Sequence, residues 1–191
     1  MSKAHYSQAM HATDHLSATP VALPAQSPIN RVYELVHLAD AFAIALPPGA
    51  SRDPETLARF LFAHQPAWVG TLMWVRDTIV ALFGLKTGRQ LAALEGAARA
   101  ERVGIFRIYG RSEAEIVVGE DDRHLDFRVS VLVSGAPAPR LTVSTVVHCH
   151  KLLGRTYLFV IAPFHRAVVK ASLHRAAQIG WPRAASTHSE E

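Results

Sequence analysis

The chain has a single cysteine, Cys149, among its 191 residues. No intrachain disulfide can form, so a disulfide-stapled secreted scaffold and a cysteine-rich zinc module are both excluded. Charged residues are also sparse, at 19%, and the formal net charge of +4 comes from 20 Lys and Arg against 16 Asp and Glu. So mild a positive charge gives little reason to expect a nucleic-acid or membrane partner.

The sequence also lacks an apolar run suited to a secretory signal or a membrane span. Residues 1–26 contain no apolar core of the kind that a signal peptide needs. The longest apolar region, 67–85, is interrupted by Arg76 and Asp77. A charged pair in the middle of a span is costly in a bilayer, so we expect a buried helix there and a cytoplasmic protein.

Motifs for cofactor and nucleophile chemistry are missing as well. The stretch GLKTG at 84–88 lacks the spacing and the strand–helix context of a phosphate-binding loop. No Ser–His–Asp or Cys–His arrangement can be assembled, and Cys149 falls on the mainly apolar face of its predicted strand, where an inert thiol is expected. We therefore expect no cofactor, and no motif in the sequence identifies a reaction.

What is present is the composition of a folded domain, since 49% of the residues are hydrophobic. Residues 1–30 are polar and punctuated by proline, so we expect a disordered N-terminal tail there. Residues 31–182 are expected to form one domain, and residues 183–191 a flexible C-terminal tail.

The first half of that domain is predicted to contain one strand and two helices. The strand covers 39–46 and ends at a Pro-Pro-Gly turn. Asp53 before Pro54 is a typical helix start, and this helix should stop near 65–66. Apolar residues from Trp68 to Leu82 recur at steps of three and four, which predicts the second helix. The segment 89–101 fits either a short helix or a loop.

The second half changes from a period of 3.6 to a period of 2. Strands are predicted at 105–109, 114–118, 123–133 and 141–150, with turns at 110–112 and 119–122 and a loop at 134–139. A long helix should run from Gly154 to about Ile179, with Pro163 either kinking it or starting its main part. Phe164, Val168 and Ala171 share one face of this helix and are expected in the core.

This order of elements predicts an α+β helix-grip fold, in which a curved antiparallel sheet wraps around a long C-terminal helix and two helices follow the first strand. The sequences Gly119–Val133, Leu141–Leu158 and Ala162–Leu173 resemble a bacterial domain-of-unknown-function family, number 2867. That family is similar to the START-like, polyketide-cyclase-like (SRPBCC) superfamily. The resemblance covers roughly residues 30–182 and implies the fold more than an activity, because the superfamily hosts many functions.

The resemblance and the fold together predict a small apolar ligand in a cavity between the sheet and the last helix. The predicted wall and anchor residues are Phe106, Phe127, Val129, Val143, His148, Tyr157, His165 and Arg166. A second hypothesis is a cofactor-independent cyclase, dehydratase or hydrolase with His124, Asp126 or His165 as acid and base, although strand parity places His124 and Asp126 on the outside. A third is a partner module for a dehydrogenase-like protein, because related domains are fused behind such domains.

For three groups of polar residues, the sequence is compatible with more than one role. Glu120, Asp121 and Asp122, with His124 and Asp126 behind them, suit acid–base chemistry, a hard cation or an ordinary solvated turn. The pair His148 and His150 could ligate zinc, but no third ligand follows at a recognised spacing, and we expect no metal. His165 and Arg166 could reach a bound anion or pair with an acid at the cavity rim.

Basic residues could also gather on the outer side of the sheet. The candidates are Arg99, Arg102, Arg107, Arg111, Arg123, Arg128, Arg140 and Lys151. Aromatic residues do not alternate with these bases as base stacking would require, so we expect no nucleic-acid partner.

Overall fold

The computed structural model describes residues 17–71, 102–122 and 124–184. Within them, seven strands form one antiparallel sheet in the order β1-β2-β7-β6-β5-β4-β3. The strands are β1 (Thr19–Val21), β2 (Leu38–Ala45), β3 (Arg102–Val103), β4 (Phe106–Arg111), β5 (Glu115–Asp121), β6 (Leu125–Ser134) and β7 (Arg140–Cys149). The helices are η1 (Pro28–Arg31), α2 (Pro54–Ala63) and α5 (Leu152–Ile179).

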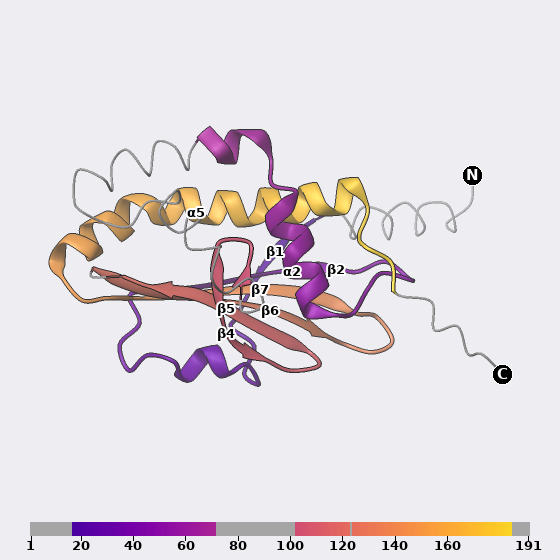
Figure 1. The fold of residues 1–191 in the computed structure, drawn as a ribbon, viewed down its shortest axis with the longest axis horizontal. Coiled ribbons are helices and arrows are strands. Elements are labelled where there is room, and N and C mark those ends of the chain that lie inside the picture. The colour runs from indigo at the N-terminus through magenta and orange to yellow at the C-terminus, as the bar shows by residue number, and fades with distance from the viewer. Residues whose placement is uncertain (1–16, 72–101, 123, 185–191) are drawn as a thin grey trace, which may run out of the picture.

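The sheet lies between two unequal coverings (Figure 1). Helices α2 and α5 pack on one side, which we call the inner face, and α5 crosses it as the longest element. The opposite side, the outer face, is crossed by residues 27–37, which include η1 and which we call the outer strap. The predicted α+β class, with a long C-terminal helix packed on an antiparallel sheet and helices after the early strands, is confirmed.

Side chains of β6 and β7 point alternately to the inner and the outer face of the sheet. The ten residues of β6 pair with the ten of β7, and Val131 lies opposite Val143 while Ser130 lies opposite Ser144. Because successive side chains in a strand point to opposite sides, the valines meet the helices and the serines face the outer strap. The sequence predicted this division of β6 and β7.

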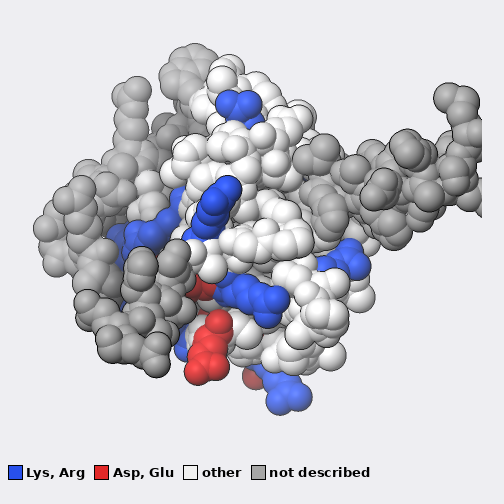
Figure 2. All heavy atoms as spheres, turned by 90° about the vertical axis from the view of Figure 1, so that its right-hand side faces the viewer, with Lys and Arg blue, Asp and Glu red and all other residues white. Residues whose placement is uncertain are grey.

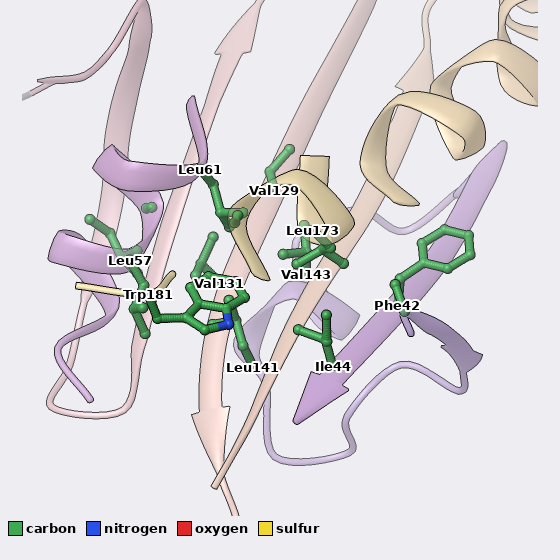
Figure 3. Close-up of a cluster of buried hydrophobic side chains, with 14 of the residues drawn as sticks. Phe42, Ile44, Leu57, Leu61, Val129, Val131, Leu141, Val143, Leu173 and Trp181 are labelled. Carbon is green, nitrogen blue, oxygen red and sulfur yellow. The ribbon is translucent and has the colours of Figure 1, made fainter. Parts of the chain in front are cut away.

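The main core lies where α2 and α5 meet the inner face. Figure 3 shows Leu57 and Leu61 of α2 and Leu173 of α5 against the sheet, with Trp181 beside them. The remaining labelled members of the cluster are Phe42, Ile44, Val129, Val131, Leu141 and Val143. Leu57 is fully buried and Leu173 is 1% exposed, so the cluster removes both side chains from water. The face predicted for the core side of α5, Phe164, Val168 and Ala171, does not belong to this cluster.

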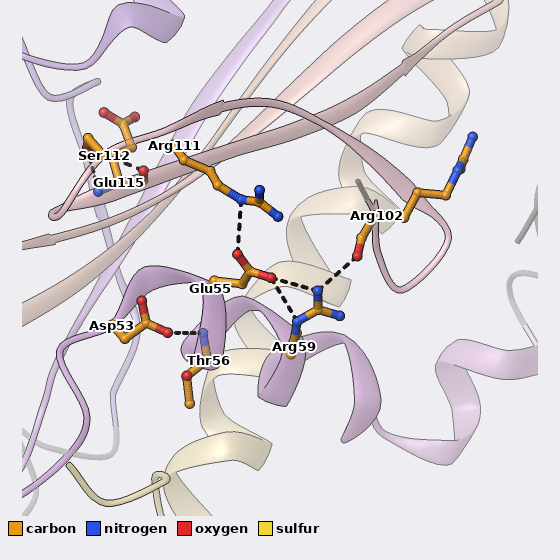
Figure 4. A network of polar contacts seen from close by, with 8 residues as sticks. All are labelled: Asp53, Glu55, Thr56, Arg59, Arg102, Arg111, Ser112 and Glu115. Atoms are coloured by element: carbon orange, nitrogen blue, oxygen red, sulfur yellow. Dashed lines mark hydrogen bonds and ion pairs between the residues drawn. The ribbon is translucent and has the colours of Figure 1, made fainter. Parts of the chain in front are cut away.

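Helix α2 is held at its start and along its exposed side, as Figure 4 shows. Asp53 is the predicted N-cap, and its carboxylate accepts a hydrogen bond of 2.7 Å from the backbone amide of Thr56. The side chain of Thr56 is the main cause that lowers the pKa of Asp53 below its ordinary value, and the backbone amides of Thr56 and Glu55 add to it. Glu55 also joins Arg59 of its own helix to Arg111 of β4, at 2.6 and 3.0 Å.

The second predicted helix begins at residues 67–71, and its remainder lies outside the described residues. The segment 89–101 and the charged pair Arg76–Asp77 lie outside them too. In α5, Pro163 is inside the helix rather than at its start, and Figure 1 shows the first turns of α5 running obliquely to the rest. A proline removes one helical hydrogen bond and crowds the preceding turn, which accounts for the bend.

The expectation of a disordered tail over residues 1–30 is wrong for its second half. Thr19–Val21 pairs with β2 as an edge strand, and η1 places Ile29 fully out of contact with water. These segments have no amphipathic period of their own, so only the sheet edge and the outer face order them. Arg183, which was expected in the C-terminal tail, forms a bridge with Ala50.

Two predicted turns are parts of strands. β4 continues through Gly110 and Arg111 with a register shift after Ile108, and β5 continues through Gly119 to Asp121. A Cβ atom on Gly119 would lie 2.2 Å from the carbonyl oxygen of Phe127. Gly119 therefore serves close approach between strands and not a turn.

Among the described helices, none is both long and apolar enough to cross a membrane.

Candidate functional site

A polar pair interrupts the apolar inner face of the sheet. Asp40 of β2 lies directly opposite Thr145 of β7. The neighbouring inward pairs on either side are apolar, namely Leu38 with Val147 and Phe42 with Val143. The first of these pairs belongs to a small apolar cluster and the second to the main core, so the Asp40–Thr145 pair separates two hydrophobic clusters.

Helix α5 brings two cationic or polar side chains to this pair. The Nε2 atom of His165 lies 3.2 Å from the Thr145 hydroxyl oxygen and 3.5 Å from Oδ1 of Asp40. Arg166 donates from Nε to Oδ2 of Asp40 over 3.2 Å. The side chain of Asp40 is only 10% exposed, while those of His165 and Arg166 are 25% and 50% exposed. We call these four residues the Asp40 cluster.

The geometry of the Asp40 cluster argues against a nucleophilic relay. In such a relay the carboxylate holds one imidazole nitrogen and the hydroxyl meets the other. Here Asp40 and Thr145 both face the same nitrogen, Nε2 of His165. The arrangement is suited instead to holding a polar group, because Oδ1 of Asp40 is buried and accepts no hydrogen bond from any described residue.

An aromatic wall lies on the same face of the sheet. Phe62 of α2, Phe106 of β4 and Phe127 of β6 form a chain of edge-on contacts, with ring centroids 5.3 and 5.5 Å apart. All three rings are only partly buried. Phe127 contacts both hydrophobic clusters, so it connects the wall to the sheet around the Asp40 cluster.

Most of the predicted wall residues share this inner face. Val129 and Val143 are 9% and 7% exposed and belong to the main core, and the register places Val129 directly opposite Thr145. Tyr157 is half-buried on α5. The structure thus brings Phe106, Phe127, Val129, Val143, His165 and Arg166 to the side of the sheet that α5 covers.

His148 does not share this site and was wrongly grouped with it. It lies opposite Asp126 in the register, on the outer face, and its Nδ1 donates to the backbone oxygen of Leu35 over 2.6 Å. Its ring packs against Tyr33 and His37 of the outer strap, with centroids 5.6 and 5.4 Å away. Because strand parity fixes the side, a ligand that contacts His165 cannot also contact His148.

The acids of the predicted turn do not gather at one place. Since β5 continues to Asp121, the register puts Glu120 beside Phe127 and Asp121 beside Asp126, on opposite faces. Glu120 lies 3.6 Å from Arg102, and Asp121 lies 2.7 Å from Arg128. The hard-cation hypothesis for this turn is therefore wrong for the acids that β5 carries.

The three predicted acid–base residues also lie apart. Asp126 is on the outer face, as its parity predicted, and its Oδ2 lies 3.0 Å from Nε2 of His150. His124 is 9% exposed, and its backbone oxygen accepts the amide of His150. His165 is on the inner face with Asp40. No two of the three candidates are brought into a shared inner site.

The outer face carries a second polar layer around Arg128. Its guanidinium carbon lies 3.4 Å from the ring centre of Tyr109 and 5.6 Å from that of Tyr33. Burial is the main cause that raises the pKa of Tyr109, to about 12, and it also raises the pKa of Tyr33. Burial alone would raise the pKa of Asp121, but hydrogen bonds from Arg128 and Tyr109 bring it below its ordinary value. This layer is a network of charged and aromatic contacts that ties the outer strap to β4, β5 and β6.

His148 and His150 are neighbours on the outer face, with ring centroids 5.0 Å apart. Among residues 17–71, 102–122 and 124–184, no group of three or more His, Cys, Asp or Glu side chains is placed to hold a metal ion. Cys149 is buried, and burial raises the pKa of its thiol, as expected for an inert cysteine.

Sequence reasoning overlooked Asp40 and Thr145. The signal was available, because Asp40 occupies an inward position in the alternation of Leu38, Phe42 and Ile44, where a charged residue is out of place. The pattern of the strand does not show which side chain Asp40 contacts, because Arg166 is 126 positions away in the chain.

Two comparisons with known proteins found nothing: no curated protein and no solved structure matches the chain. A third comparison, with family models, matches residues 32–172, a range that includes Asp40, Thr145, His165 and the strands between them. The matching model is described as a protein of unknown function, DUF2867. Because that match covers well over half of the 191 residues, the chain belongs to the DUF2867 family of proteins of unknown function.

Proposed function

We propose that the protein binds a small, largely apolar molecule between the inner face of the sheet and α5, and that Asp40 holds the polar group of this molecule. The observation that carries the proposal is the buried carboxylate of Asp40, whose Oδ1 atom has no hydrogen bond from a described residue. A buried acceptor left without a donor costs free energy in the unliganded protein. A donor supplied by a ligand would remove that cost.

The surroundings of Asp40 indicate the chemistry of the ligand. One side of the cluster leads to the partly exposed rings of Phe127 and Phe106, which suit an apolar body. The Oδ1 atom of a carboxylate can only accept hydrogen bonds and repels an anion, so a hydroxyl or amine donor on the ligand is favoured and an acidic group is disfavoured. Apolar walls with few polar anchors are the usual composition of small-molecule sites.

The same placement supports membership in the START-like, helix-grip superfamily. In that arrangement the ligand lies between the sheet and the long C-terminal helix, which is where the Asp40 cluster and the aromatic wall are found. A crystal structure of the protein with its ligand would test this assignment directly.

The first experiment is native mass spectrometry of the purified full chain, followed by denaturing extraction and identification of any released molecule. Binding of N-phenyl-1-naphthylamine, a fluorescent apolar probe with one N–H donor, then tests the site. The D40N variant should weaken probe binding about tenfold, because a hydrogen bond to a charged group contributes roughly 1.5–3 kcal/mol.

The matched control is D126N, which changes a carboxylate on the opposite face of the same sheet. It should leave probe binding unchanged. Equal loss of binding in D40N and D126N, or no probe binding by the unmodified chain, would contradict the proposal.

A further inference from the structure

Large apolar side chains lie exposed on the first half of α5. Phe159 is 84% exposed, Leu152 77%, Val160 54% and Phe164 49%. Phe164 was predicted to lie in the core, and that prediction is wrong because α5 turns Leu158, not Phe164, towards the sheet. Four such residues on one stretch of helix are unusual on a protein that meets only water.

These residues share one side of the helix. Leu152 and Phe159 are seven positions apart and Val160 and Phe164 are four apart, and at 3.6 residues per turn all four side chains fall within an arc of about 140°. Such spacings keep the side chains on one broad stripe of a helix. The opposite stripe carries Leu158 and Ala162, which pack on the small hydrophobic cluster of the sheet. The helix is therefore apolar on the side that faces away from the sheet as well as on the side that it buries.

The charges around this stripe are of one sign. Arg155 is three residues after Leu152 and four before Phe159, which places it between them on the helix surface. Lys151 immediately precedes the helix, and both cations are exposed. The helix contains no Asp or Glu, and none occurs anywhere between Asp126 and Glu190. Figure 2 shows a different side of the molecule, at the C-terminal end of α5, where Lys and Arg side chains are also more prominent than Asp and Glu among the described residues.

Two acids that fold near the start of α5 have partners in the sheet. The backbone oxygen of His124, in the turn between β5 and β6, lies close to Gly154 of the helix. Of the acids that flank this turn, Asp121 pairs with Arg128 and Asp126 with His150. On α5 itself, an approaching anionic surface meets the exposed cations Lys151 and Arg155 and no carboxylate.

We propose that the outward stripe of α5, made of Leu152, Phe159, Val160 and Phe164, docks on a membrane surface that carries anionic lipid headgroups. Apolar side chains enter the boundary between headgroups and acyl chains, and Lys151 and Arg155 contact the lipid phosphates. Sequence analysis predicted no membrane partner, because the net charge is small and the longest apolar region is interrupted by a charged pair. A helix that lies on the surface needs neither.

The test is co-sedimentation of the full chain with lipid vesicles. One set is pure phosphatidylcholine and the other is phosphatidylcholine mixed with phosphatidylglycerol. We expect binding to the anionic vesicles, much weaker binding to the neutral ones, and a fall in binding as salt is added. Absence of binding to anionic vesicles would overturn the proposal.

Two pairs of variants separate the stripe from the rest of the protein. L152S combined with F159S should reduce binding about tenfold or more, since both side chains are exposed and their loss leaves the fold unchanged. I179S, at the other end of the same helix and 43% exposed, is the matched control and should bind normally. K151Q combined with R155Q should weaken only the part of vesicle binding that added salt removes. R175Q, which changes another exposed cation of α5, is the control for this pair.

Equal effects of a stripe variant and its control would overturn the assignment to this stripe. So would a concentration-dependent dimer in analytical ultracentrifugation that L152S with F159S abolishes, because a second copy of the chain would then be the partner of this face. The vesicle assay contains no apolar probe, so its result is independent of the ligand proposed for the Asp40 cluster.

Discussion

Each face of the sheet buries a carboxylate, and the two carboxylates are hydrogen-bonded differently. On the outer face, the carboxylate of Glu115 is 6% exposed and accepts hydrogen bonds from the hydroxyls of Ser27 and Ser130. On the inner face, the carboxylate of Asp40 is nearly as buried, but Oδ1 is left without a hydrogen bond from any described residue. The sequence alone makes these two acids look alike.

This difference indicates that Glu115 stabilises the fold, whereas Asp40 is available for binding. Glu115 joins the outer strap to β6 through Ser27 and Ser130, so its bonds are part of the packing of residues 27–37 on the sheet. Asp40 joins a strand to a helix that already packs there through Val169, Leu173 and other apolar residues. A buried polar group that is incompletely bonded and adds little packing is a better candidate for binding than a fully bonded one.

The contrast between Glu115 and Asp40 is tested most directly by removing each carboxylate in turn. E115A should lower the free energy of unfolding by about 3 kcal/mol, because the hydroxyls of Ser27 and Ser130 lose their charged acceptor in a buried place. Urea unfolding followed by circular dichroism measures the loss. A change under about 1 kcal/mol would mean that the outer strap does not depend on this carboxylate.

A second test concerns the backbone of the outer face. G119A should lower the free energy of unfolding by about 2 kcal/mol, because the new Cβ would meet the Phe127 carbonyl oxygen at 2.2 Å and the strands must shift. G110A is the matched control in the neighbouring strand, where the nearest atom to the new Cβ is 4.0 Å away. Thermal unfolding of the two variants should differ clearly, and equal melting temperatures would show that the close approach at Gly119 is unimportant.

The inner face should respond much less to loss of its acid. D40L should change the free energy of unfolding by less than about 1 kcal/mol, because an apolar side chain suits the two flanking clusters and Arg166 is half exposed to water. The same urea titration used for E115A measures it. If D40L cost as much as E115A, Asp40 would be a structural tie and the contrast between the faces would disappear.

The smallest expected effect is a pH dependence of the outer strap. The Nδ1 atom of His37 accepts the backbone amide of Cys149 over 3.0 Å, so this bond requires the neutral ring. Burial, aided by Arg155 and His148, lowers the pKa of His37 in the folded protein. The unfolded chain then binds the proton more readily, so this stabilisation is complete above the ordinary histidine pKa of about 6.5 and is lost as the pH falls through the lowered value.

Hydrogen exchange at the Cys149 amide measures this effect. Protection, corrected for the intrinsic exchange rate, should decrease from pH 8 to pH 5 in the unmodified chain. In H37L, which has no acceptor, protection should be lower at all pH values and lack this dependence. Protection that is constant with pH in the unmodified chain would show that His37 does not hold the outer strap.

Much of the fold was predictable because its signals are local. The alternation of Phe127, Val129 and Val131 defines an inward face wherever the strand lies, and Asp53 before Pro54 caps a helix with its own neighbours. Predictions failed where glycine or charge suggested a turn. Gly110 and Gly119 lie inside strands, because the partner strand decides whether a glycine turns the chain or admits a close neighbour.

The candidate site was predicted only in part. His165 and Arg166 were identified from their position on α5, but His148 was grouped with them although its parity places it on the other face. Asp40 was missed although it breaks the alternation of its strand. A sequence pattern shows that a residue is out of place, but it does not show which distant side chain will meet it.

The sequence by itself determined the strands β2, β6 and β7, the start of α2 and the long helix α5, because hydrophobic period and capping act between near neighbours. Only the tertiary structure decided that Thr19–Val21 and residues 27–37 are ordered, since they gain their contacts from a sheet edge and a sheet face made elsewhere. It also decided that Asp40 meets Arg166 across 126 positions of the chain. Contacts of that separation depend on how the sheet and the helix pack, and packing is a property of the whole fold.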